Sequence, residues 1–181
     1  MEYKMNNEQI KNLSMNGRMA YSIMCIEKFL MQIYPEKSWE ILSREMWKVT
    51  NMYWDEWDFR FMEVMPQYLF EKSNYEESEF EYITEDEYDA FCRLYKGSTS
   101  GDESDELVIL IDHLHQLAQV YSYSDIPGVG EESLIIIESL CMMLQKKNVE
   151  LPDASILAFS DFKEKSGWGN FFEGNKYSLV I

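Results

Sequence analysis

The two histidines of the chain are its clearest candidates for metal or acid–base chemistry. Asp112, His113 and His115 are neighbours in the sequence. Asp112 and His115 are three positions apart, so in a helix they share one face. A transition metal needs at least one further ligand, and His113 lies on a different face. We therefore expect no metal and no cofactor, and interpret both histidines as surface or hydrogen-bonded side chains.

Other motifs give weak support to a catalytic function. Gly128-Val129-Gly130 precedes an apolar segment, but it lacks the third glycine of a dinucleotide fingerprint and the lysine of a P-loop. We interpret it as a helix-entry loop. The acids of 102–106 depart from the spacing of a calcium loop, and there is no nucleophile elbow. We expect no catalytic residue; an enzyme that uses carboxylates or the Asp112/His115 pair remains an alternative.

Acidic and aromatic residues are concentrated between Tyr53 and Glu106. This stretch holds seventeen acidic residues and four basic ones, a net −13 of the −17 of the chain. Such a surface suits a basic protein partner, because opposite potentials speed encounter and aromatic side chains supply contact area. Direct binding of nucleic acid would need clustered Lys and Arg instead. The predicted partner-binding residues are Asp55, Asp58, Tyr75, Glu76, Glu77, Glu79, Phe80, Glu81 and Tyr82.

Composition predicts one folded domain over residues 1–181. Hydrophobic residues make up 46% of the chain and aromatic residues 15%, too much for a disordered acidic tail. The chain has an odd number of cysteines, and all three lie in apolar contexts: Cys25, Cys92 and Cys141. This pattern favours free thiols in a reducing compartment. The chain has neither a signal-peptide pattern nor an apolar run of bilayer length. We therefore expect a cytoplasmic protein that does not contact a membrane.

Apolar periodicity predicts an all-α fold, a helical bundle of about six to eight helices with an irregular C-terminal tail. We expect the first helix to end near Asn16-Gly17, a break near Pro66, an acidic loop over 72–83 and a capping box at Thr84 to Glu87. The helix over 131–147 is apolar nearly all round, so we expect it to form the core. The other expected helices cover 19–33, 38–50, 54–64, 84–96, 107–121 and 153–159.

The sequence positions of three tryptophans indicate whether each is expected in the core or at an interface. Trp54 and Trp57 lie on an amphipathic stripe, which favours the core, whereas Trp168 in its glycine-rich loop could be either. Tyr75, Phe80 and Tyr82 lie among charges, and we expect them at an interface.

Several segments resemble the small, acidic, mostly helical immunity proteins of bacterial polymorphic toxin systems. The resemblance lies in the segment from Asn51 to Trp57 through Met65-Pro66, and in Phe159 to Phe162, Gly167-Trp168-Gly169 and Tyr177-Ser178. It implies a stoichiometric inhibitor that binds a cognate toxin and has no catalytic residues to transfer. We expect this function first; an acidic mimic of nucleic acid or a regulatory adaptor is the alternative binding function.

Overall fold

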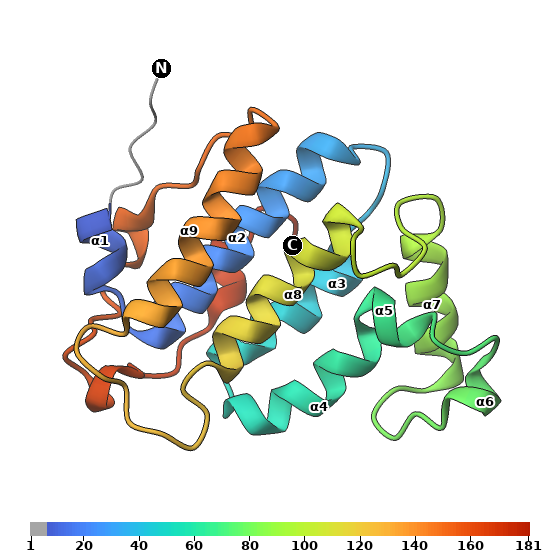
Figure 1. The fold of residues 1–181 in the computed structure, drawn as a ribbon, viewed down its shortest axis with the longest axis horizontal. Helices are drawn as coiled ribbons and strands as arrows, with labels where there is room; N and C mark the ends of the chain where they lie inside the picture. Colours follow the sequence, from blue (N-terminus) through green and yellow to red (C-terminus); the bar gives the residue numbers. More distant parts are fainter. Residues whose placement is uncertain (1–6) are drawn as a thin grey trace.

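The computed structural model describes residues 7–181 and confirms an all-α single domain. Within these residues there are nine α-helices and no strand, only a bridge between Leu13 and Asp161 (Figure 1). The α-helices are α1 (Asn7–Asn12), α2 (Met15–Ile33), α3 (Glu40–Trp47), α4 (Trp54–Val64), α5 (Pro66–Leu69), α6 (Tyr75–Ser78), α7 (Glu85–Tyr95), α8 (Glu106–Gln119) and α9 (Glu131–Lys146). Four 3₁₀ turns complete them: η1 (Lys48–Thr50), η2 (Ala154–Leu157), η3 (Lys165–Gly167) and η4 (Gly174–Tyr177).

Helix α2 is the central element, and the prediction that 131–147 forms the core is wrong. Most of α2 is buried, and it packs against α3, α8 and α9 (Figure 1). Helix α9 buries one face, which includes Ile137 and Leu144. On its other face Ile135 is 65% exposed and Met142 is 50% exposed. The periodicity of α9 is blurred because apolar residues also occupy its solvent face.

The predicted helix end at Asn16-Gly17 is also wrong, because both residues lie inside the first turn of α2. Ser14 caps this helix by accepting a hydrogen bond from the Gly17 N–H at 3.2 Å. A Cβ on Gly17 would lie 3.1 Å from the side chain of Ser160. Glycine therefore allows the C-terminal segment to approach α2, where the hydroxyls of Ser14 and Ser160 are 2.6 Å apart.

Local signals elsewhere are confirmed. Met65 is extended and Pro66 starts α5, so the chain breaks between α4 and α5 as the proline predicts. Thr84 and Glu87 form both hydrogen bonds of the capping box at the start of α7. These two features mark the starts of α5 and α7, the helices that precede and follow the acidic segment in the chain (Figure 1).

The C-terminal segment is irregular, as predicted, and docks on the body of the domain. Tyr177 and Val180 pack against the core. The Leu179 N–H donates to the buried carboxylate of Glu27 on α2 at 2.7 Å. This brings loops around Trp168 and Phe171 to the same end of the molecule as the start of α4.

Candidate functional site

The predicted acidic loop over 72–83 contains one short helix, α6, capped by Asn74, and a left-handed turn at Glu79. Glu76, Glu77, Glu79 and Glu81 are all exposed. Tyr82 is 45% exposed, and its ring stacks on that of Phe59 with centroids 5.9 Å apart. We call the surface formed by these four glutamates with Phe59, Tyr68, Glu71 and Tyr82 the acidic–aromatic face.

Two predicted interface aromatics, Tyr75 and Phe80, also have a structural role. Tyr75 and Phe80 are half-buried and lie 5.8 and 5.9 Å from the ring of Tyr88 on α7. The Tyr75 hydroxyl donates to the carbonyl of Ile83 at 2.8 Å. These contacts hold the loop against the core, and both rings are half-buried rather than fully exposed. Asp55 is partly exposed at the start of α4.

Helix α4 holds the end of this loop through two charged side chains. The carboxylate of Glu63 accepts hydrogen bonds from the backbone N–H groups of Glu81, Tyr82 and Ile83 at 2.7, 2.8 and 3.0 Å. Arg60 pairs with Glu45 at 3.0 Å and Glu87 at 2.6 Å, and also donates to the Tyr82 carbonyl. Charge-assisted hydrogen bonds are the stronger ones, and these contacts anchor the loop that carries Tyr82 to α4.

A hollow of about 260 Å³ opens beside the aromatic residues of the acidic–aromatic face. Its lining combines aromatic rings with charged rim groups: Phe59, Met62, Glu63, Tyr68, Glu71, Lys72, Ser78, Phe80 and Tyr82. Phe59 is 54% exposed and Tyr68 is 37% exposed. Large exposed rings beside a hollow are the features that protein interfaces concentrate at their centres.

Asp58 does not belong to this surface, and its predicted place among the partner-binding residues is corrected. It is 4% exposed and lies 2.9 Å from His115 Nε2, in the geometry of an ion pair rather than a directed hydrogen bond. The Gln119 amide donates to both of its oxygens. Asp58 points inward because α4 packs against α8 on this side.

The predicted pairing of Asp112 and His115 on one face is confirmed, with 3.8 Å between Oδ1 and Nδ1. Burial favours the neutral ring of His115, but the adjacent carboxylates of Asp112 and Asp58 outweigh it and raise its pKa to about 9. His115 is 7% exposed and His113 8%, so neither is a surface side chain. His113 contacts the Ile109 carbonyl at 2.6 Å and the Ser139 hydroxyl at 3.0 Å. The cluster joins α4 to α8.

The Gly128-Val129-Gly130 segment coordinates a buried arginine. Arg18, fully buried on α2, donates to the carbonyls of Val129 at 2.8 Å and Gly130 at 3.1 Å and to the Ser133 hydroxyl at 2.6 Å. A Cβ on Gly130 would lie 2.7 Å from Arg18 Nη1. Burial lowers the pKa of Arg18 to about 10. The glycines therefore admit the guanidinium, which agrees with a helix-entry loop.

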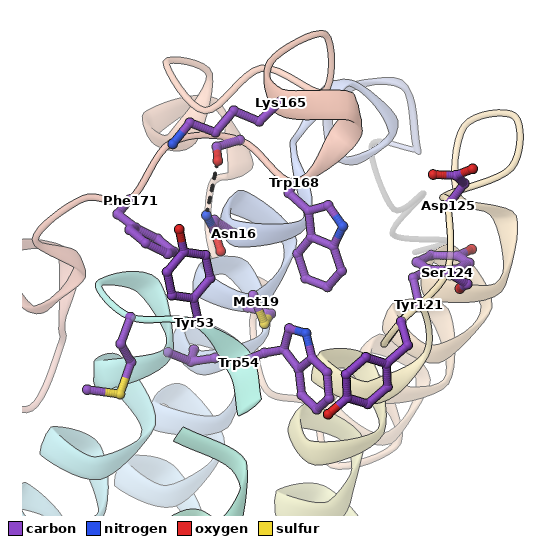
Figure 2. A pocket seen from close by; sticks show the side chains of 14 residues that line it. Asn16, Met19, Tyr53, Trp54, Tyr121, Ser124, Asp125, Lys165, Trp168 and Phe171 are labelled. Carbon is purple, nitrogen blue, oxygen red and sulfur yellow. Dashed lines mark hydrogen bonds between the residues drawn. The ribbon is translucent and has the colours of Figure 1, made fainter. Parts of the chain in front are cut away.

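A second cavity, of about 590 Å³, lies between the start of α4 and the C-terminal loops. Figure 2 shows the rings of Tyr53, Trp54, Trp168 and Phe171 around it. We call this cavity the aromatic pocket. Trp54 and Trp168 are partly exposed in its wall, whereas Trp57 is 2% exposed in the core.

Sequence reasoning missed the aromatic pocket although it marked both of its walls. Asn51 to Trp57 and Gly167-Trp168-Gly169 are two of the segments that carry the family resemblance, and both contribute lining residues. The signal available was a tryptophan between two glycines in a loop. Nothing in linear spacing indicates that this loop meets the start of α4.

Comparison of the chain with protein-family models, curated proteins and solved structures finds no match in any of the three. The structure itself shows an all-α domain with an acidic–aromatic face and a separate aromatic pocket. Across residues 7–181, no three His, Cys, Asp or Glu side chains are arranged to hold a metal ion. None of the helices in the described part of the chain is long and apolar enough to cross a membrane.

Proposed function

We propose that this chain is a cytoplasmic immunity protein that binds a basic toxin domain through the acidic–aromatic face and occludes it stoichiometrically. The observation that carries the proposal is the loop over 79–83, which presents Tyr82 stacked on Phe59 and is held by Glu63 and Arg60. A face that is already ordered loses less conformational entropy on binding than a flexible one. The proposed role needs no catalytic residue, metal or cofactor.

Charge and aromatic side chains have different roles in this binding. Exposed glutamates steer a basic partner over distances of about 8 Å at physiological salt and raise its association rate roughly 10- to 1,000-fold. The rings of Phe59 and Tyr82 act after encounter, because buried aromatic anchors slow dissociation. The hollow beside these rings would receive a Lys or Arg side chain of the partner, which would lie over a ring.

Association kinetics test the role of the charges. Changing Glu76, Glu77, Glu79 and Glu81 together to Gln should slow association with a toxin domain encoded beside this chain and flatten its salt dependence. The control variant changes the same number of exposed glutamates outside the face: Glu36, Glu132, Glu138 and Glu150. Stopped-flow mixing at several salt concentrations measures both. Equal association rates for the two variants at low salt would place the binding surface elsewhere.

Dissociation kinetics test the aromatic anchors. Phe59→Ala combined with Tyr82→Ala should speed dissociation by at least about 30-fold, the effect of losing one anchor of about 2 kcal/mol, and by about 1,000-fold if the two contributions add. The association rate should hardly change. Ile135→Ala is a control, because this side chain is also largely exposed but lies on α9. An unchanged dissociation rate in the double variant would contradict the proposal.

A further inference from the structure

The aromatic pocket has the properties of a ligand site that is separate from the acidic–aromatic face. Its volume of about 590 Å³ lies within the usual range of small-molecule sites, about 300–1,000 Å³. Tyr53 and Phe171 meet edge to face at 5.1 Å on one side, and Trp54 meets Tyr123 in the same way on the other. The faces of these rings attract cations.

Asn16 supplies an oriented acceptor in the lining. This side chain is 3% exposed, and its Nδ2 donates to the carbonyl of Gly169 at 3.4 Å (Figure 2). It also donates to the carbonyl of Asn170 at 3.3 Å. These bonds assign the amide nitrogen to the C-terminal loop and leave Oδ1 without a donor among the described residues. A ligand that brings an N–H group to this oxygen would gain a hydrogen bond that the protein alone does not make.

Charge at the pocket also selects the ligand. Asp125 and Lys165 are the two charged lining residues, and both are exposed. Lys165 Nζ lies 5.6 Å from the centroid of the Phe171 ring, whereas Asp125 has no ionic partner within residues 7–181. The chain as a whole carries −17. Long-range attraction and an unpaired rim carboxylate therefore both favour a cation.

We infer that the aromatic pocket binds a guanidinium group, carried either by a small molecule or by an arginine of a peptide. A guanidinium is planar and weakly hydrated, so it stacks on indole and phenol rings while its edge donates to an acceptor such as Asn16 Oδ1. A primary ammonium is more strongly hydrated, and a quaternary ammonium has no N–H to donate. The guanidinium would enter from the side of Asp125, away from Lys165.

Tryptophan fluorescence measures this binding directly. Trp54 and Trp168 line the pocket and the other three tryptophans, Trp39, Trp47 and Trp57, are at most 3% exposed. N-acetyl-argininamide should give a saturable change below about 10 mM. N-acetyl-citrullinamide, which keeps the shape without the charge, and N-acetyl-lysinamide, which keeps the charge without the plane, should each bind at least about fivefold more weakly. Equal affinity for either control, or no saturation, would overturn the inference.

Two variants at the rim of the pocket should change the affinity for N-acetyl-argininamide in opposite directions. Asp125→Asn should weaken binding of N-acetyl-argininamide up to about fivefold, and Lys165→Gln should tighten it by a similar factor. Tyr53→Ala removes an exposed wall ring and should weaken binding. Tyr82→Ala, on the acidic–aromatic face, should leave it unchanged. Loss of affinity in both charge variants, or none in Asp125→Asn and Tyr53→Ala, would contradict the assignment.

The peptide Gly-Gly-Arg-Gly-Gly distinguishes the two sources of the group. If the peptide binds more tightly than N-acetyl-argininamide, its flanking backbone adds contacts. This result would assign the site to an arginine within a peptide. Weaker binding would mean that the flanking residues clash, and would assign it to a small guanidino compound. Either result rests on the pocket alone, so it stands or fails separately from toxin binding at the acidic–aromatic face.

Discussion

His115 is a buried imidazole between two carboxylates, and this arrangement makes the stability of the protein depend on pH. Its pKa in the folded protein is about 9, above the ordinary value of 6.5, because Asp112 and Asp58 stabilise the charged ring. The folded state therefore binds the proton more tightly than the unfolded chain. The resulting stabilisation is complete below about pH 6.5 and is lost as the pH rises through about 9.

We predict that His115→Gln removes this dependence. The free energy of unfolding of the wild type should fall by up to about 3 kcal/mol more than that of the variant between pH 6.5 and 9. Urea unfolding at several pH values measures the difference. His113→Gln is the matched control, because the ring of His113 contacts a carbonyl and a hydroxyl rather than carboxylates. Parallel pH profiles for wild type and His115→Gln would show that the ring is not charged in the fold.

The two faces of α9 differ sharply at the scale of a single helix. Ile137 is completely buried, whereas Ile135, two residues earlier, is 65% exposed. Ile137→Asp should cost several kcal/mol, a large part of a typical stability of about 5–15 kcal/mol, because it places an unpaired carboxylate in the core. Ile135→Asp should change stability by less than about 0.5 kcal/mol. Thermal unfolding of the pair measures this, and similar losses in both would mean that the outer face of α9 is covered.

Elements with local determinants could be predicted from the sequence, and those that depend on neighbours could not. The break at Pro66 and the capping box at Thr84 are set by residues within one turn, and both were correct. The continuation of α2 through Gly17 depends on Ser160, which approaches it from the other end of the chain. The central position of α2, in place of α9, likewise depends on which helices pack around each one.

Glu63 shows how one side chain of α4 orders the segment that carries Tyr82. Its carboxylate accepts three consecutive backbone N–H groups, and the neutral amide of Glu63→Gln would accept fewer and weaker bonds. The amides of residues 81–83 should exchange with solvent roughly tenfold faster, a local loss of about 1.4 kcal/mol. Global unfolding should change little. Glu56→Gln, an exposed site on the same helix, is the control in hydrogen-exchange mass spectrometry; unchanged exchange at 81–83 in Glu63→Gln would mean that the loop is ordered by other contacts.

At the scale of the whole molecule, both candidate sites combine segments that are distant in the chain. The acidic bias of residues 53–106 includes the four exposed glutamates Glu76, Glu77, Glu79 and Glu81, which are separated by the half-buried Ser78 and Phe80. It could not separate Asp58, which faces α8, from Asp55, which is partly exposed. The aromatic pocket requires Trp168 and Trp54 to line the same cavity, and this follows from the docking of the C-terminal segment. Composition predicts a surface, whereas tertiary packing determines which of its residues are accessible.

Glu27 is the point at which the end of the chain docks on the central helix. Its side chain is completely buried and accepts hydrogen bonds from Trp47 Nε1 at 2.8 Å, the Ser178 hydroxyl at 2.6 Å and the Leu179 N–H at 2.7 Å. Ser43 on α3 donates a further hydrogen bond. All four donors are neutral, so the buried carboxylate is stabilised by hydrogen bonds.

We predict that Glu27→Gln loosens the C-terminal segment as well as weakening the fold. A glutamine has one acceptor oxygen and turns an NH₂ group toward the remaining donors, so at least one buried N–H or O–H is left unpaired, at a cost of about 1–3 kcal/mol. Amide exchange at residues 178–181 should rise, and cleavage there by a carboxypeptidase should become faster. Glu138→Gln makes the same chemical change at an exposed position of α9 and should leave both measurements unchanged. If Glu27→Gln kept wild-type stability and wild-type protection of 178–181, the segment would be docked by the apolar contacts of Tyr177 and Val180 alone.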